Sequence, residues 1–169
     1  MALPTQDGRL PKMNEDELAR ALGTLGYEGF RHLPAPRMRR NPADLLLAAL
    51  ENPALESRLA EALPWLAWRF AALDWEYVVS RAKMLDLQNR LGFVVTLGKQ
   101  LADQHGDTQS SELLRSVEER LRNSVLARAD ALGRLTKAER DWLERERPSE
   151  ARQWNVLSDM RVEHLTHAR

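Results

Sequence analysis

The chain has 169 residues, 43% hydrophobic and 30% charged, which is long enough for one domain with a buried core and excludes disorder throughout. Lysine plus arginine and aspartate plus glutamate both number 25, which excludes a general electrostatic attraction to nucleic acid or membranes. The absence of cysteine excludes disulfides and thiolate metal sites, and no apolar run approaches a membrane span of ~20 residues, so we expect a cytoplasmic protein without a membrane partner.

The first forty residues predict a leader, a short helix and a connector. Residues 1–13 contain two prolines and a glycine and are expected to form a flexible leader. Asn14, with Glu17 three positions later, has the capping-box pattern and predicts a helix from Glu15 to about Leu25. Residues 26–40 contain two prolines and no helical period, so we expect a basic connector there.

The connector carries four arginines against one acid, Glu28; the arginines are Arg31, Arg37, Arg39 and Arg40. Two interpretations remain open. The arginines could bind phosphate groups or dock an acidic partner. They could instead belong to a solvated linker whose side chains lie over the core surface, which is the interpretation that we favour.

The next segments predict a series of short helices. Asn41 followed by Pro42 is a strong helix start, and the same pair of residue types recurs at Asn52. Pro64 is expected to break or kink the second of these helices, so that residues 64–72 form a short apolar helix of their own. The tryptophans and phenylalanine in that segment are typical of a core.

A stretch from Asp74 to His105 contains no proline and predicts one long central helix capped by Asp74. A helical wheel gives its second half two apolar stripes, so we expect other helices on two sides of it. Gly92 and Gly98 lie inside this helix, where glycine costs about 1 kcal/mol. We therefore expect both glycines to face closely packed helices.

Two more helices and a tail complete the chain. An amphipathic helix is expected from about Ser110 to Leu132, folded back antiparallel along the central helix. Thr136 begins a second capping box and predicts a helix from Lys137 to about Arg147. Residues 14–160 therefore form one all-α domain, and residues 161–169 are expected to be a frayed tail.

Three polar residues, Asp86, Asn89 and Arg90, interrupt an apolar stripe of the expected central helix. Asp86 and Arg90 are spaced to form an ion pair, and Trp68 and Trp75 are expected nearby. Such a cluster could be a structural network that pins neighbouring loops, an interface completed by a partner, or a catalytic site. We favour the structural interpretation, because half-satisfied buried polar groups cost about 1–3 kcal/mol each.

Recognised catalytic and metal-binding patterns are missing from the sequence. It contains no HExxH, GxSxG, phosphate-binding loop or dinucleotide fingerprint. Glu118 and Glu119 are adjacent and point about 100° apart on a helix, so they are expected on a solvated face. We therefore expect no enzyme activity, no cofactor and no metal; the histidines are scattered at His32, His105, His164 and His167.

Two segments carry a resemblance to a family of small bacterial all-α proteins encoded beside nucleotidyltransferase-type toxins. They read ALPWLAWRFAALDWEYVVSRAKMLDLQNRLGFVVTLGKQLA and WLERERPSEARQWNVLSD. The resemblance spans roughly Leu45 to Asp159 and implies an antitoxin-like protein that binds and restrains a co-encoded partner in a toxin–antitoxin or defence system. It does not single out functional residues.

These observations predict one all-α helical bundle of five to seven helices around a long central helix, with less than 5% strand. We expect a non-enzymatic protein-interaction module. The candidate binding residues are Asp86, Asn89, Arg90, Arg37, Arg39 and Arg40. The alternative is a DNA-binding transcriptional regulator that uses the arginine-rich arm 31–40 and the short helix after Asn14.

Overall fold

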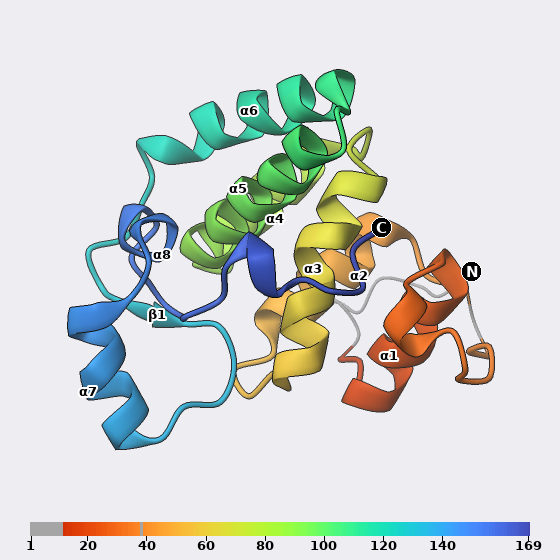
Figure 1. Cartoon of the computed structure of the whole chain (residues 1–169), viewed down its shortest axis with the longest axis horizontal. Coiled ribbons are helices and arrows are strands. Elements are labelled where there is room, and N and C mark those ends of the chain that lie inside the picture. Colours follow the sequence, from red (N-terminus) through yellow and green to blue (C-terminus); the bar gives the residue numbers. More distant parts are fainter. Residues whose placement is uncertain (1–11, 38) are drawn as a thin grey trace.

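A computed structural model of the chain describes residues 12–37 and 39–169, and this part is almost entirely helical (Figure 1). The α-helices are α1 (Glu15–Leu25), α2 (Pro42–Glu51), α3 (Ser57–Arg69), α4 (Trp75–Met84), α5 (Gln88–Gln104), α6 (Thr108–Arg122), α7 (Lys137–Glu146) and α8 (Ser149–Gln153). The shorter elements are the 3-10 helices η1 (Glu28–Phe30) and η2 (Val162–His164) and the strands β1 (Asp130–Ala131) and β2 (Val156–Leu157). The all-α prediction is confirmed.

The first helix begins and ends as predicted. The Asn14 side chain accepts a hydrogen bond from the Glu17 N–H at 2.8 Å, and Gly26 ends α1 with a φ of 111°. In the connector that follows, Tyr27 is buried against Trp65, with ring centroids 5.2 Å apart. The connector is therefore anchored to the core at its start. The first eleven residues of the expected leader lie outside the described residues.

Helix α3 continues through Pro64, so the separate helix expected at residues 64–72 is wrong. A proline inside a helix removes one backbone hydrogen bond and normally kinks or breaks the helix. Pro64 is buried, and its carbonyl oxygen lies 2.9 Å from the position that a Cβ on Gly98 would take. Close packing of α3 on α5 holds the helix together at this point.

The expected central helix is two helices, α4 and α5, which accounts for a count of eight described α-helices instead of five to seven. Asp86 lies between them with a φ of 56°, in the left-handed region. The Leu87 N–H donates to the Ala82 carbonyl at 2.7 Å and the Asp86 N–H to the Lys83 carbonyl at 3.4 Å. This pair of bonds is the Schellman motif, and aspartate tolerates the left-handed position that glycine usually fills.

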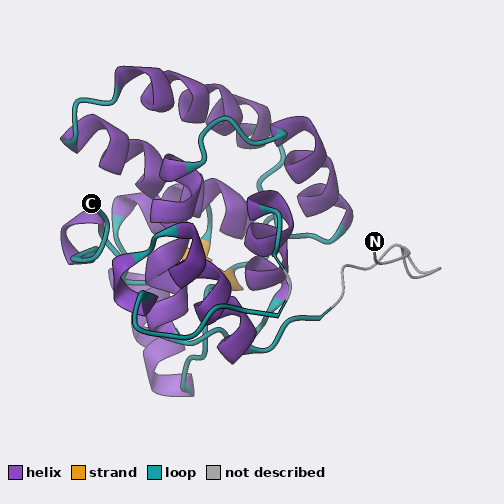
Figure 2. Ribbon diagram, turned by 90° about the vertical axis from the view of Figure 1, so that its right-hand side faces the viewer, coloured by secondary structure: helices purple, strands orange, loops and turns teal. Residues whose placement is uncertain are grey.

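Helix α5 is the core helix of the molecule, with α6 and α3 packed along it (Figure 1). Figure 2 shows that helices make up most of the described part of the chain and that the strands are short. Most of its side chains are buried, which confirms for α5 the prediction of neighbours on two sides. Gly98 faces α3, as expected. Gly92 faces the indole of Trp154, and a Cβ at Gly92 would lie 2.1 Å from a ring carbon.

The C-terminal third differs most from the prediction. Helix α6 ends at Arg122 instead of Leu132, and the chain then passes through a turn and a bend to β1, which pairs in parallel with β2. The last residues are not a frayed tail. Leu165 and Ala168 are buried, and the His167 ring lies edge-on to Tyr27 with centroids 6.1 Å apart. No helix in the described ranges is long and apolar enough to cross a membrane.

Candidate functional site

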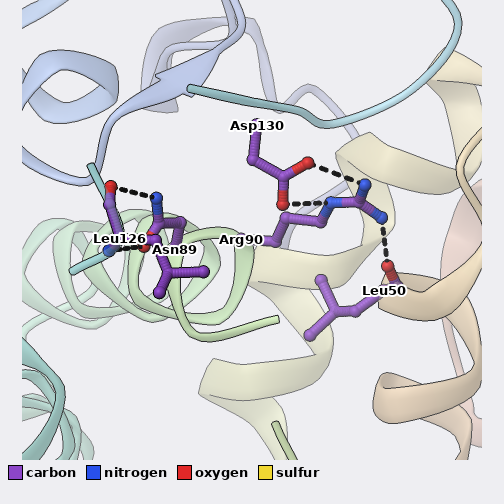
Figure 3. A network of polar contacts seen from close by, with 5 residues as sticks. All are labelled: Leu50, Asn89, Arg90, Leu126 and Asp130. Atoms are coloured by element: carbon purple, nitrogen blue, oxygen red, sulfur yellow. Dashed lines mark hydrogen bonds and ion pairs between the residues drawn. The ribbon is translucent and has the colours of Figure 1, made fainter. Parts of the chain in front are cut away.

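Asn89 holds the non-helical segment that follows α6 (Figure 3). Its Nδ2 donates to the Leu126 carbonyl at 3.1 Å, and its Oδ1 accepts from the Leu126 N–H at 2.8 Å. The Asn89 side chain is fully buried. The side-chain amide therefore satisfies both the N–H and the carbonyl of Leu126.

Arg90 ties the same segment to α2 (Figure 3). Its Nε and Nη2 donate to the two carboxylate oxygens of Asp130 at 2.7 and 2.8 Å, and its Nη1 donates to the Leu50 carbonyl at 2.6 Å. The Arg90 and Asp130 side chains are only 12% and 24% exposed. A two-point guanidinium–carboxylate contact of this kind fixes geometry as well as charge.

Asp86 lies outside this network, and the indole N–H groups of the two tryptophans expected nearby donate to other residues. Asp86 is exposed and does not pair with Arg90, because the left-handed turn at Asp86 changes the helical phase between them. The Trp75 Nε1 donates to the Ala71 carbonyl at 2.8 Å. The Trp68 Nε1 donates to Asp107 at 3.0 Å, far along the chain from Arg90. The expected ion pair between Asp86 and Arg90 is wrong, and the indole N–H groups of Trp68 and Trp75 donate to other residues, whereas the contacts of Asn89 and Arg90 are those of a network that pins a loop.

Asn155 also bonds the Leu126 carbonyl that Asn89 binds, a role that the sequence did not predict. Its Nδ2 donates to the Leu126 and Ala127 carbonyls at 3.2 and 2.9 Å. Arg147 donates to the Asn155 Oδ1 at 3.1 Å and to the Val156 carbonyl at 3.2 Å. Asn155 has a φ of 52°, which asparagine tolerates, but periodicity gave no sign of it.

The connector arginines are placed at the surface. Arg37 and Arg39 are exposed and Arg40 is half-buried. Arg37 and Arg40 share a shallow hollow of about 370 Å³ with the carboxylates of Asp16 and Glu17. The local field is therefore mixed in sign, and the prediction that these arginines bind a partner stays a prediction.

A groove of about 620 Å³ lies between α3 and α7, and we call it the α3–α7 groove. Residues spaced three and four apart on each helix face the groove, as expected for one helical face. The rest of the lining comes from the loop before α3, the loop between β1 and α7, the segment from β2 to η2, and Glu15 of α1. The lining residues are Glu15, Ala54–Ser57, Ala60, Glu61, Leu132–Leu135, Glu139, Trp142, Leu143, Leu157–Met160 and His164.

The α3–α7 groove combines an apolar floor with an exposed aromatic wall. Leu55, Leu143 and Leu157 are buried at its base. Trp142 projects from α7 and is 49% exposed, although its neighbour Leu143 is buried. Leu143 is the one buried residue of α7, so the helix is held to the body mainly through the floor of the groove.

Five carboxylates line the groove, and two of them accept hydrogen bonds from backbone N–H groups. Glu139 accepts from the Thr136 N–H at 2.7 Å, and that backbone hydrogen bond lowers the pKa of the Glu139 carboxyl. Glu15 accepts from the Glu56 N–H at 3.0 Å. The carboxylates of Glu56, Glu61 and Asp159 make no hydrogen bond or ion pair within the described ranges. They are therefore available to a ligand.

Glu118 is a further departure from the sequence analysis, because it is buried between α6 and α5 instead of solvated. Burial raises the pKa of the Glu118 carboxyl above its ordinary value, and nearby Lys99 opposes this rise. Its Oε1 has no hydrogen-bond partner among the described residues. Glu119 is exposed, as expected.

The described residues contain no group of three or more histidine, aspartate or glutamate side chains placed to hold a metal ion. The α3–α7 groove is therefore the strongest candidate site by shape and chemistry. A pocket with an apolar floor, an exposed tryptophan and unpaired polar groups at its edge is typical of a binding site. No protein-family model, curated protein or solved structure matches the chain.

Proposed function

We propose that the chain is a non-enzymatic protein-interaction module that binds a partner protein in the α3–α7 groove and restrains it. The observation that carries the proposal is Trp142, a half-exposed indole above a floor of buried leucines. Tryptophan is among the residues that contribute most to protein interfaces when a partner covers them. A bulky indole exposed to water offers apolar area that a partner can bury.

The resemblance over residues 45–159 indicates which partner to test first. It favours an antitoxin-like role in a bacterial toxin–antitoxin or defence system, with a co-encoded nucleotidyltransferase-type protein as the restrained partner. The second resembling segment begins at Trp142 and ends at Asp159, and both of these residues line the α3–α7 groove. That segment therefore overlaps the lining of the groove at both of its ends.

The test is co-expression of the chain with each protein encoded beside its gene, followed by size-exclusion chromatography with light scattering. We expect a stable complex with the wild-type chain and a loss of affinity of at least tenfold for Trp142→Ala, because truncation of an interface tryptophan costs about 2 kcal/mol or more. Leu113→Ala is the matched control, since Leu113 is also exposed but lies on α6. Equal binding by both variants would show that the groove is not the interface.

A second candidate function is DNA binding through the connector, favoured by the exposure of Arg37 and Arg39. Neutralising phosphates makes DNA affinity fall steeply with salt. Arg37→Gln combined with Arg39→Gln should then reduce the salt dependence of binding to duplex DNA. A salt-independent affinity, or none, would reject this candidate.

A further inference from the structure

We infer that the α3–α7 groove recognises a basic, arginine-bearing segment of the partner protein, held by carboxylates at the rim while one guanidinium stacks on Trp142. The inference rests on the proposed function and adds the chemistry of the bound segment. Its basis is the uneven charge of the lining, with five carboxylates against one arginine, Arg134, and one histidine, His164.

The carboxylates of Glu56, Glu61 and Asp159 come from two separate parts of the groove lining, on or next to α3 and on the segment after β2. None of the three has a hydrogen-bonding or ionic partner within the described ranges. Like charges brought around one hollow repel each other, and a bound cation relieves that repulsion. The rim therefore favours a positively charged occupant over an acidic or neutral one.

Trp142 selects among cations. Among aromatic rings, the tryptophan face attracts cations most strongly. A guanidinium suits it better than an ammonium group does, because the planar group stacks on the ring while its N–H groups still reach carboxylates. Trp142 lies on the same wall as Glu139 and opposite the first turns of α3. An arginine that enters over the indole can thus meet carboxylates across the groove.

The apolar floor adds a requirement for length. Leu55, Leu143 and Leu157 provide a surface that the aliphatic part of an arginine or a neighbouring apolar side chain can cover. A cavity of about 620 Å³ accommodates several side chains and not only one ion. The occupant is therefore a peptide segment and not a free cation.

The experiment measures binding of a short fluorescein-labelled peptide of alternating glycine and arginine by fluorescence anisotropy. A matched peptide carries citrulline, the uncharged isostere, in place of each arginine. We expect the arginine peptide to bind and the citrulline peptide to bind at least tenfold more weakly, with an affinity that falls as salt rises from about 0.05 to 0.5 M.

Variants locate the binding. Glu56→Gln combined with Glu61→Gln should weaken binding about three- to tenfold, since each exposed ion pair contributes little alone. The control removes the same charge from the exposed face of α6 by Glu112→Gln combined with Glu119→Gln, and should bind as the wild type does. Trp142→Ala should lose at least tenfold. Arg134→Gln should bind more tightly, because it removes the cation from the groove.

The inference is overturned if citrulline and arginine peptides bind equally, or if the groove and control variants lose the same affinity. Circular dichroism of each variant excludes unfolding as the cause of a loss. A co-encoded partner that needs Trp142 but tolerates the loss of Glu56 and Glu61 would leave the proposed function intact and reject the basic segment. If both the partner and the peptide bind the groove variants as tightly as the wild type, the proposed function and the basic segment are both rejected.

Discussion

At the residue scale, two non-glycine residues of the described ranges have left-handed backbone, for different reasons. Asp86 ends α4 and its side chain is exposed, so its backbone conformation is its main contribution. Asn155 has nearly the same φ, but its side chain bonds two carbonyls of the segment after α6. Substitution by glycine should therefore have opposite effects at the two positions.

We predict that Asp86→Gly is neutral or stabilising, whereas Asp86→Val is about 1–2 kcal/mol less stable than Asp86→Gly, because a β-branched residue is strained in this region. Asn155→Gly should destabilise the protein by about 1–3 kcal/mol, since it removes the hydrogen bonds to the Leu126 and Ala127 carbonyls and the one from Arg147. Urea denaturation of the three variants measures these differences. A loss on Asp86→Gly as large as that on Asn155→Gly would contradict this account.

The Arg90–Asp130 contact belongs to the same scale. Asp130→Ala leaves the Arg90 guanidinium in a region where it is only 12% exposed, and removal of one partner of a buried pair costs about 3–5 kcal/mol. A double-mutant cycle with Arg90→Met measures the coupling between the two residues. The exposed pair Asp16–Arg20, 3.0 Å apart on α1, is the control and should contribute less than about 1 kcal/mol. Similar coupling in both pairs would contradict the structural role of Arg90.

At the element scale, the packing of α5 depends on two glycines. A Cβ on Gly92 would overlap the indole of Trp154, and one on Gly98 would meet the Pro64 carbonyl at 2.9 Å. If no atom lay so close to either glycine, replacing it by alanine would stabilise the helix by about 1 kcal/mol. The sign of the substitution therefore reports whether the close approach exists.

We predict that Gly92→Ala destabilises the protein by about 1–3 kcal/mol or more, and Gly98→Ala by less, because overpacking outweighs the gain in helix propensity. Ser116→Ala, at an exposed position of α6, measures propensity alone and should be neutral or slightly stabilising. Thermal denaturation followed at 222 nm compares the three. A more stable Gly92→Ala variant would show that Trp154 does not cover α5.

Between α5 and α6, Glu118 should make stability depend on pH. Its pKa is raised in the folded state, so the folded protein binds the proton more tightly than the unfolded chain. Below the pKa that the carboxyl has in the unfolded chain, Glu118 is protonated and its burial costs no charge. As the pH rises through the higher pKa of the folded state, the carboxyl ionises and the buried charge lowers the free energy of unfolding. Stability from this residue therefore falls with rising pH.

We predict that Glu118→Gln raises the melting temperature at pH 7 and that the gain disappears near pH 4, where the wild-type carboxyl is protonated. Glu119→Gln removes the same charge from an exposed position and should give no such difference between the two pH values. Melting curves at both pH values test the prediction. A lower melting temperature for Glu118→Gln at pH 7 would mean that the ionised carboxyl is stabilising.

At the scale of the whole molecule, local signals predicted the starts of helices well. Asn14, Asn41, Asp74 and Thr136 all accept hydrogen bonds from the first turns of their helices, because a cap depends only on the next few residues. Helix ends were harder to predict. The end of α4 uses aspartate where glycine is usual, and α6 stops where Asn89 and Asn155 hold the following segment.

The candidate site was less accessible to sequence reasoning than the fold. Trp142 was assigned to a short helix, and nothing in its neighbours showed that the indole would remain half-exposed. The α3–α7 groove is assembled from segments more than a hundred residues apart, so no local pattern describes it. Asn89 and Arg90 were recognisable as polar residues in an apolar stripe, but their partners Leu126 and Asp130 were not.

The position of Trp154 over Gly92 has a consequence for how the protein is made. A ribosome releases α1 to α6 first, yet the surface of α5 at Gly92 is covered only when Trp154 has emerged. A chain that stops at Pro148 would leave this surface bare and should bind a hydrophobic dye that the full chain excludes. Adding the peptide 149–169 in trans should reverse dye binding, with the Trp154→Ala peptide as the inactive control. The last segment of the chain therefore covers this surface of α5 only after all the other helices that pack on α5 have been synthesised.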